Sequence, residues 1–580
     1  MSNKLELTWF DKEKEINVEP RILLENYELG YEKHPDGLFD NYYYDNMLIH
    51  GDNLLALKAL ENKYTGKIKC IYIDPPYNIS AAGVPFDDNI EHSLWLNLMR
   101  SRIQIMYKLL DSDGMLATQI DDENYAYLYM LISEIFGKNN LKTICVKMSE
   151  ATGVKMASVN KAGSIAKIKE YIILAKKDGI KNLSMEMVPK GKWDNEYKTY
   201  CENISDEELA NIKRIIEDEE RTIEDINYVD ECVKKINFVN MNDVAKRETG
   251  TNATDEWCYK NANRIVQIAT LTGGARDLAI NKKSEFGNDC PSAFSIVTAK
   301  KKMYIIKGSF NTETNLSRCK LLFADLYLSY NPGDMWSDIK TTGLDNEGGV
   351  DFKNSKKPER LIRRIIKLNT KPGDIVLDSF LGSGTTAAVA HKLNRRFIGI
   401  EMGEQAYTHC KKRLDLVIDG TEQGGISKEE NWQGFGGYKF YEVAPTLITK
   451  DCFDEEIINK EYNADMLAAA VALHEGFTYN PDTNVFWKQS KANENSYLFV
   501  TTKHVAKSLI DAIKQSMNDD EFLIIACKSY DSDLGDIQNI SIKKIPQMLL
   551  NKCEYGVDNY NLHIISPPSY EEAEEELDSE

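Results

Sequence analysis

The chain has 580 residues, of which 71 are Lys or Arg and 91 are Asp or Glu, so its formal net charge is −20. One hydrophobic core rarely serves more than about 250–300 residues, so this length predicts two to four domains, or one large domain that carries insertions. The composition, 42% hydrophobic and 28% charged, excludes collagen-like, low-complexity and wholly disordered classes. The negative charge argues against a protein that coats nucleic acid non-specifically, although it is compatible with a local basic groove.

Membrane and metal signals are absent from the sequence. No segment reaches the roughly 18 apolar residues that would cross a bilayer, and the charged N-terminus lacks the apolar core of a signal peptide. The 11 cysteines are scattered without a Cys-x-x-Cys pair, and the 8 histidines do not cluster with them. These patterns predict a cytoplasmic protein with reduced thiols, no metal site and no membrane contact.

Strands and helices alternate in the first well-patterned part of the chain. The run 67–73 is apolar, contains β-branched residues and is bounded by a Gly and by Asp-Pro-Pro, which is typical of a buried parallel strand. The full alternation predicts a doubly wound α/β sheet. Its predicted elements are the strand 47–50, the helix 54–63, the strand 67–73, the helix 94–110, the strand 115–120 and the helix 124–136.

The middle of the chain changes character. Residues 142–192 contain eleven Lys against four acidic residues, and one strand is evident there, at 170–176. The segment 206–231 is acidic and helical, and the next hundred residues read as irregular except for strand-like pieces. These pieces are at 293–298 and 302–307.

The α/β pattern returns at residue 358. A basic helix at 359–368 leads into the strand 375–377, and a Gly-rich turn then opens a helix that ends near residue 393. A further strand is predicted at 397–400. The final run, EEAEEELDSE, predicts a solvated tail.

The first motif with chemical meaning is Asp74-Pro75-Pro76-Tyr77, directly after the buried strand. A turn alone would explain the prolines, but ligands bind at the strand ends of open α/β sheets. Two prolines stiffen the loop, so the Asp74 carboxylate and the Pro75 carbonyl offer two fixed acceptors for an exocyclic amino group. Tyr77 offers a face on which a planar base can stack. We therefore predict these four residues to be catalytic.

The second motif is a Gly-rich turn between a strand and a helix. It resembles a phosphate loop, but no Lys follows its second Gly, so a Walker-type site is excluded. The glycines permit close backbone approach, a helix N-terminus favours a carboxylate, and Glu401 ends the next strand, where an acid commonly holds ribose hydroxyls. The predicted cofactor-binding residues are Asp52, Asp378, Phe380, Gly382, Ser383, Gly384, Thr385 and Glu401.

Together the two motifs resemble the catalytic and S-adenosylmethionine motifs of amino-methylating DNA methyltransferases. DPPYN matches the adenine-N6 type, since the cytosine-N4 type usually has Ser where Asp74 stands, and the motif order resembles the circularly permuted β class. The flanking segments, at about 46–178 and 330–415, are similar to the modification (Mod) subunit of type III restriction-modification systems. One departure is Ser379, which replaces the usual proline of the cofactor motif without removing a ligand group.

The resemblance implies a doubly wound, Rossmann-like methyltransferase sheet of the α/β class, with an inserted target-recognition region and a C-terminal α+β domain. It divides the chain into an N-terminal arm at 1–45, a catalytic half at 46–178, a target-recognition region at 179–330, a cofactor-binding half at 331–420 and a C-terminal domain for dimer or partner contacts, with its acidic tail, at 421–580.

The implied activity is transfer of the methyl group of S-adenosyl-L-methionine to the N6 amino group of a flipped adenine in double-stranded DNA. The implied partners are a second copy of the chain and a separate ATP-dependent restriction (Res) subunit. Two alternatives remain: a DNA-recognition subunit that only targets a nuclease, and a stand-alone regulatory methyltransferase. Methylation of RNA or of a protein amide is disfavoured, because Asn usually replaces the catalytic Asp there.

The basic span is the predicted source of phosphate contacts, which position a protein on DNA without reading its sequence. A merely solvated lysine-rich surface is the competing interpretation, and the basic residues of 356–371 are the alternative DNA-binding surface. The predicted DNA-binding residues are Lys155, Lys161, Lys167 and Lys169.

Overall fold

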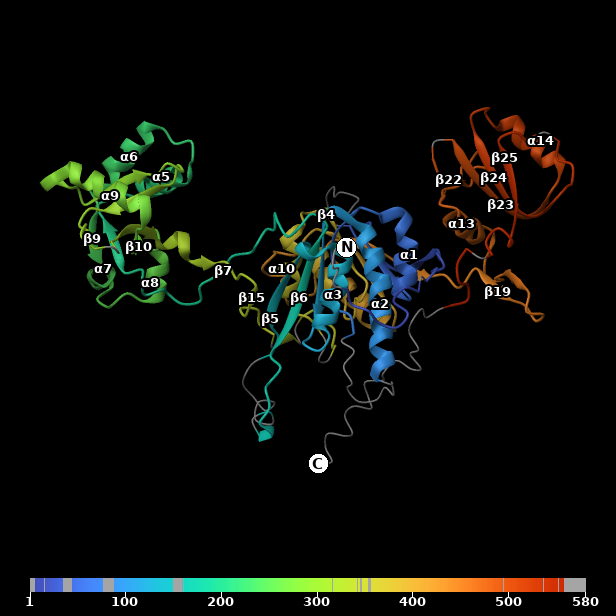
Figure 1. Cartoon of the computed structure of the whole chain (residues 1–580), viewed down its shortest axis with the longest axis horizontal. Coiled ribbons are helices and arrows are strands. Elements are labelled where there is room, and N and C mark those ends of the chain that lie inside the picture. Colours follow the sequence, from blue (N-terminus) through green and yellow to red (C-terminus); the bar gives the residue numbers. More distant parts are fainter. Residues whose placement is uncertain are drawn as a thin grey trace. The chain divides into compact units, whose positions relative to one another are not determined.

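The computed structural model describes the chain apart from residues 1–5, 15, 35–43, 77–87, 150–158, 160, 315–316, 342, 345–346, 353–355, 494, 536, 551 and 558–580, and apart from the side chains of 88–91. The chain divides into two compact units. One contains Met1–Glu186 and Gly333–Glu580, and the other is Met187–Pro332 (Figure 1). Among the described residues, no helix has the length and apolar character needed to span a bilayer.

A ten-stranded sheet forms the centre of the first unit (Figure 1). Strands β1 and β6 run antiparallel to their neighbours, and the other strands share one direction. The spatial order is β1 (Leu23–Lys33), β18 (Gly436–Val443), β2 (Met47–His50), β17 (Arg396–Glu401), β16 (Ile375–Asp378), β3 (Ile68–Ile73), β4 (Leu110–Ile120), β6 (Lys169–Lys176), β5 (Leu141–Lys147) and β15 (Met335–Trp336).

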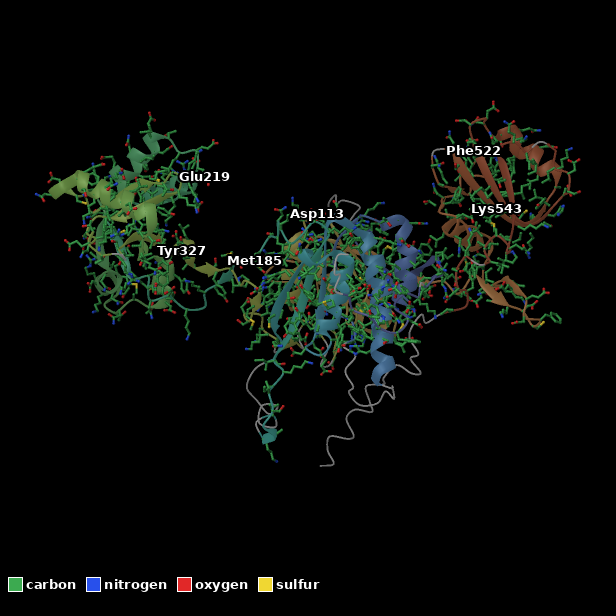
Figure 2. The ribbon with its side chains drawn as sticks, viewed as in Figure 1. Asp113, Met185, Glu219, Tyr327, Phe522 and Lys543 are labelled. Atoms are coloured by element: carbon green, nitrogen blue, oxygen red, sulfur yellow. The ribbon has the colours of Figure 1, made fainter. Side chains whose placement is uncertain are left out.

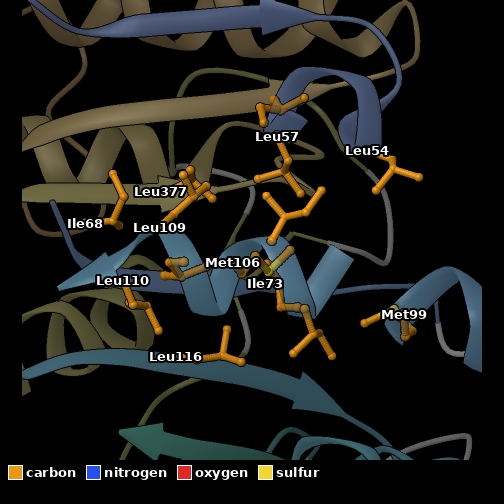
Figure 3. Packing of buried hydrophobic residues seen from close by; sticks show 14 of the residues in the cluster. Leu54, Leu57, Ile68, Ile73, Met99, Met106, Leu109, Leu110, Leu116 and Leu377 are labelled. Atoms are coloured by element: carbon orange, nitrogen blue, oxygen red, sulfur yellow. The ribbon is translucent and has the colours of Figure 1, made fainter. Parts of the chain in front are cut away.

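Helices cover both faces of this sheet. Along β3 the side chains alternate: Ile71 and Ile73 belong to one hydrophobic core, and Cys70 and Tyr72 to the other. Figure 3 shows part of the first core, in which Met99 and Met106 of one helix pack near Ile73 of the sheet. Helices α1 (Asn53–Tyr64), α2 (Asp88–Leu109) and α3 (Tyr125–Phe136) contribute to the first core, and α10 (Glu359–Asn369), α11 (Thr385–Lys392) and α12 (Lys412–Asp419) to the second. The doubly wound α/β prediction is confirmed.

The strand order reverses between β16 and β3. From β3 the chain passes through α2 to β4 on one side, and from β16 it passes through α11 to β17 on the other. In open α/β sheets, ligands bind beyond the carboxyl ends of the strands at such a switch point. Both predicted motifs begin at this place.

The predicted strands and helices of the two α/β stretches are present, but β1, β5, β15 and β18 of the sheet were not predicted. Strand β5 alternates between buried and partly exposed residues, and the lysines of its basic span hid it, while β15 is too short for any period. Strands β1 and β18 lie in the segments predicted to be an N-terminal arm and a C-terminal domain, yet they pair with each other and extend the central sheet.

The second unit has helices and an antiparallel sheet of its own. Its six-stranded sheet has the order β11 (Ala293–Val297), β12 (Met303–Lys307), β13 (Arg318–Phe323), β10 (Ile265–Thr270), β8 (Thr199–Glu202) and β9 (Asn237–Asn240). Its helices are α5 (Asp206–Glu217), α6 (Ile223–Val233), α7 (Met241–Thr249), α8 (Asp255–Lys260) and α9 (Gly273–Phe286). The prediction that most of the segment after residue 231 is irregular is therefore wrong. The strands of this segment are too short to show a clear alternation of apolar and polar residues in the sequence.

A short ladder closes the second unit where the chain enters and leaves it. Strand β7 (Val188–Pro189) pairs antiparallel with β14 (Ser329–Tyr330). Because the two ends meet, the segment is an insertion within one polypeptide rather than a terminal domain.

The C-terminal part carries both helices and strands. Its five-stranded sheet has the order β21 (Thr478–Tyr479), β22 (Ser490–Lys491), β23 (Ser496–Val505), β24 (Phe522–Tyr530) and β25 (Ile540–Lys544). The helices are α13 (Ala464–His474) and α14 (Lys507–Ser516), and β19 (Ile448–Lys450) pairs with β20 (Glu456–Ile458).

Candidate active site

The two predicted motifs lie side by side although about 300 residues separate them. Strand β3 pairs parallel with β16, with Cys70 opposite Val376 and Ile71 opposite Leu377. Asp74 follows the end of β3, and Asp378 is the last residue of β16. The two carboxyl groups are close enough for Asp74 to raise the pKa of Asp378. The sheet therefore joins the catalytic and cofactor motifs into one site.

The catalytic motif is anchored to the first helix that follows it. Pro75 is buried, and the carbonyl oxygen of Pro76 accepts a hydrogen bond of 2.9 Å from the indole N–H of Trp95 in α2. The side chain of Asp74 is 22% exposed, and its Oδ2 lies 3.2 Å from Nζ of Lys357. Tyr77 lies outside the described residues, so its predicted stacking role stays a prediction.

Asp378 is the most deeply buried acid of the site. Burial raises its pKa to about 7, and Asp74 and Glu401 add to the effect, while hydrogen bonds from Thr386 and from the N–H of Phe380 oppose it. The Phe380 N–H donates to Oδ1 at 2.9 Å, which turns the chain sharply at the end of the strand. Asp378 therefore shapes the start of the Gly-rich loop.

Glu401 holds the middle of that loop. Its Oε2 accepts a 2.7 Å hydrogen bond from the N–H of Gly382, and its Oε1 accepts one of 3.0 Å from Gly403. Burial raises the pKa of Glu401 above its usual value, against the effect of these backbone donors. The predicted acid is thus at the predicted place, beside the loop.

The two glycines of the loop differ in what they face. Gly382 has φ +55°, and a Cβ built on it would meet no atom within 4 Å, so open space adjoins the backbone there. Gly384 has φ +79°, and its Cβ would lie 3.2 Å from the Cα of Cys410. Both positions favour glycine, but close packing within the protein, rather than ligand approach, accounts for Gly384.

Asp52 lies on the neighbouring strand end and has protein partners at both oxygens. Its Oδ1 accepts from the N–H groups of Leu54 (2.8 Å) and Leu55 (3.2 Å) and caps α1. Its Oδ2 is 3.1 Å from the guanidinium of Arg102, which is fully buried. The adjacent Asn53 donates to the carbonyl of Ser379 at 2.8 Å, so this cap is joined to the cofactor motif.

A buried charge network behind the Gly-rich loop was not predicted. The guanidinium of Arg413 donates to Thr385 Oγ1 at 2.7 Å and to Glu359 Oε1 at 2.8 Å, and Lys392 bonds both Glu359 and Glu422. All four charged side chains are at most 2% exposed. We refer to Glu359, Lys392, Arg413 and Glu422 as the loop-support network. In the sequence Glu359, Lys392 and Arg413 look like ordinary amphipathic-helix charges and Glu422 looks like a loop residue, so no signal marked them.

The predicted DNA-binding lysines are only partly available. Lys161 is exposed, whereas Lys167 pairs with Asp121 at 2.5 Å and Lys169 pairs with Asp122. Lys155 lies outside the described residues. In the alternative surface at 356–371, basic side chains of α10 are also paired with acids: Arg360 with Glu429, Arg363 with Glu429, Glu430 and Glu186, Arg364 with Asp338, and Lys367 with Glu430.

Comparisons with known proteins find chains of similar sequence. A chain described as the probable type III restriction-modification enzyme HindVI Mod subunit of Haemophilus influenzae is 34% identical over 415 residues, which are 69% of this chain and 54% of that one. The type III restriction-modification enzyme EcoPI Mod subunit of Escherichia phage P1 is 26% identical over 509 residues, 79% of this chain and 68% of that one. The chain thus spans about half the length of the Haemophilus relative.

A solved structure and a family model complete the comparison. A putative DNA modification methylase from Thermus thermophilus, complexed with S-adenosyl-L-methionine, is 12% identical, with 69% of this chain and 99% of that one covered, at a TM-score of 0.31. The family model described as DNA methylase matches residues 68–412, which include both motifs and the whole second unit. The chain belongs to the DNA methylase family.

Proposed function

We propose that this chain is the modification subunit of a type III restriction-modification system. It transfers a methyl group from S-adenosyl-L-methionine to the N6 amino group of a flipped adenine in a short double-stranded recognition sequence. The observation that carries this proposal is the meeting of the Asp74 motif and the Gly-rich loop at the switch point between β3 and β16. The presence of Asp at position 74 favours adenine, and the matched Mod subunits support the type III assignment.

The residues of the second motif fit the methyl donor. Glu401 stands beside the loop, open space adjoins Gly382, and the buried hydroxyl of Ser379 has no hydrogen-bond partner among the described residues. Phe380, the loop 382–385 and Glu401 would hold the donor, with Glu401 toward its ribose hydroxyls. When bound, S-adenosyl-L-methionine supplies an electrophilic methyl group.

The residues of the first motif act on the acceptor. The Asp74 carboxylate and the Pro75 carbonyl accept the two N–H bonds of the adenine amino group, which draws the nitrogen lone pair out of conjugation with the ring. Tyr77 stacks on the base, which must leave the duplex to reach the site. The amino nitrogen would gain the methyl group, whose bond to the donor sulfur would break, and would lose one proton to water.

The division of labour follows the two compact units. The inserted unit, Met187–Pro332, is our proposed target-recognition region. It contains none of the predicted catalytic or cofactor-binding residues and has its own hydrophobic cores. Lysines of the preceding basic span would position the phosphates. We further propose that the chain works in the cytoplasm as a homodimer and joins an ATP-dependent restriction subunit, which brings the cleavage activity.

The decisive experiment incubates the purified chain with methyl-labelled S-adenosyl-L-methionine and plasmid DNA of mixed sequence. Mass spectrometry of the digested nucleosides should detect N6-methyladenine. Asp74→Ala should abolish the label while DNA affinity stays within about threefold, because the lost acceptor acts chiefly in the transition state. Asp113→Ala is the control, since Asp113 lies near the start of β4 (Figure 2), whereas Asp74 follows the end of the parallel neighbour β3.

Three outcomes would contradict the proposal. Label in N4-methylcytosine would change the substrate base, and label in RNA alone would change the substrate class. Specific DNA binding without any label would favour a recognition subunit that only targets a nuclease. Light scattering tests the dimer, and co-purification with a Res subunit encoded nearby would separate a type III system from a stand-alone methyltransferase.

A further inference from the structure

We propose that Lys357 is a positioning residue for methyl transfer, which holds the Asp74 carboxylate ionised and in one orientation at the end of β3. This inference rests on the proposed function and adds to it a cation that the catalytic motif itself does not contain. Lys357 lies about 280 residues from Asp74 in the chain, immediately before Pro358 and the start of α10.

The contacts place Lys357 between two acids. Its Nζ lies 3.2 Å from Asp74 Oδ2 and 3.2 Å from Glu170 Oε2, and its side chain is only 14% exposed. Burial lowers the pKa of Lys357, but Asp74 and Glu170 raise it by more, so the pKa lies above the usual value. The ammonium group therefore stays charged at every pH at which the enzyme would work.

Glu170 is itself fixed by the neighbouring strands. Its Oε2 accepts a 2.5 Å hydrogen bond from the amide of Gln119 in β4, and the Gln119 carbonyl accepts one of 2.7 Å from the hydroxyl of Tyr72 in β3. Tyr72 is 2% exposed, so its hydroxyl needs this internal acceptor. These contacts form a series of side-chain interactions that crosses β3, β4 and β6 and ends at the Asp74 carboxylate. Its members, in order, are Tyr72, Gln119, Glu170, Lys357 and Asp74.

The helix start that follows Lys357 is anchored by a side chain. Two residues later, Glu359 bonds both Lys392 and Arg413 in the loop-support network. Arg413 in turn bonds Thr385 of the Gly-rich loop at 2.7 Å. The segment that carries Lys357 is therefore fixed to the loop that would hold the methyl donor, so the donor and the Asp74 carboxylate share one support.

The charges around Asp74 explain why a cation is needed. Asp378 interacts electrostatically with Asp74. Burial raises the pKa of Tyr72 well above its usual value, and the negative charges of Asp74, Asp378 and Glu170 add to that effect. Three acids in one partly buried site favour uptake of a proton by one of them. Because a protonated carboxyl group offers a donor where the adenine amino group needs an acceptor, Lys357 keeps the site in its active charge state.

The test is the pH dependence of turnover in the full-length chain, measured with the DNA and labelled donor that the wild type uses. Lys357→Met should lower kcat at pH 7 by about 10²-fold, comparable to the loss of one transition-state hydrogen bond. The acid side of its kcat profile should move to higher pH, because a carboxylate without its cation takes up a proton more easily. KM for DNA should change less than about threefold, and Lys357→Arg should recover most of the turnover.

Two further variants separate electrostatics from loss of structure. Glu170→Gln removes a neighbouring negative charge while leaving a polar partner, so the acid side of its profile should move to lower pH, opposite to Lys357→Met. Lys69→Met is the matched control. Lys69 lies near the start of β3, the strand that Asp74 follows, and pairs with Asp113 near the start of β4. Its kcat and pH profile should equal those of the wild type.

The results distinguish this inference from the function on which it rests. A wild-type chain that methylates no DNA would overturn the proposed function. A wild type that methylates adenine, with a Lys357→Met profile that does not move or a loss confined to KM, would overturn the positioning role alone. If Lys357→Met fails to fold, Lys357→Arg and Glu170→Gln decide the matter. A Lys357→Arg chain that recovers no turnover, or a Glu170→Gln profile whose acid side stays in place or moves to higher pH, would also overturn the positioning role.

Discussion

Replacing Lys392 by Met should destabilise the methyltransferase sheet strongly. Lys392 Nζ lies 2.9 and 2.8 Å from the two oxygens of Glu359 and 2.5 Å from Glu422 Oε2, and its side chain is fully buried. The methionine would occupy the space of the lysine side chain, but it would leave the Glu359 and Glu422 carboxylates with Arg413 as the remaining cation of the network. Breaking a buried ion pair by removing one partner typically costs about 3–5 kcal/mol, and we expect a loss of that size.

The pH dependence of this loss identifies its cause. In the wild type, burial raises the pKa of Glu359, but Lys392 and Arg413 lower it by more, so the group contributes stability above about pH 4.5 that is lost as pH falls further. Without Lys392 the pKa of Glu359 should rise, and the uptake of a proton as pH falls would relieve the repulsion. The loss of unfolding free energy should therefore be smaller at pH 5 than at pH 7.

Urea unfolding of the intact chain, followed by circular dichroism at both pH values, measures this effect. Lys181→Met is the control, because Lys181 is 59% exposed and lies 3.5 Å from Asp178. Such surface pairs contribute at most about 1 kcal/mol. A loss below about 1 kcal/mol for Lys392→Met, or one equal at both pH values, would show that the loop-support network does not hold the fold through its charges.

Other expectations concern the cofactor loop, DNA binding and acid stability. Gly384→Val should weaken S-adenosyl-L-methionine binding in calorimetry by about tenfold or more, because a branched residue at φ +79° is strained and its Cβ meets Cys410. Gly373→Val, at φ +87° in a turn before β16, is the control and should leave the affinity unchanged. Equal losses of affinity in the two variants would refute the reasoning. Burial lowers the pKa of His391 to about 4, so stability should be complete above about pH 6.5 and fall by up to about 1.4 kcal/mol per pH unit between 6.5 and 4; urea midpoints of His391→Gln that fall as steeply would contradict this. Removing one lysine that neutralises a DNA phosphate should flatten the salt dependence of DNA affinity by about 0.9 in log–log slope. If the slope is unchanged after all four predicted DNA-binding residues are neutralised together, these lysines are solvated and do not contact DNA phosphates. The four residues are Lys155, Lys161, Lys167 and Lys169.

The local pattern of residues was sufficient to predict the strands and helices of the two α/β stretches. Residues 70–73 are apolar on both faces because β3 is a central parallel strand, buried between two layers of helices. The two motifs were also readable, because Asp-Pro-Pro-Tyr and a Gly-rich turn with a following acid use residue types that their chemistry requires. Glu401 shows this, since its place at a strand end follows from counting along the chain.

The tertiary structure decided which of these segments meet. Only the pairing of β3 with β16 brings Asp74 beside Asp378, and such long-range pairing leaves no local signal. The same holds for β1 with β18, which sequence analysis assigned to separate parts of the chain. Lys357 reads as one more surface lysine in a Lys-Lys-Pro sequence, because a charged side chain acquires its role only from burial and from the acids that the fold places around it.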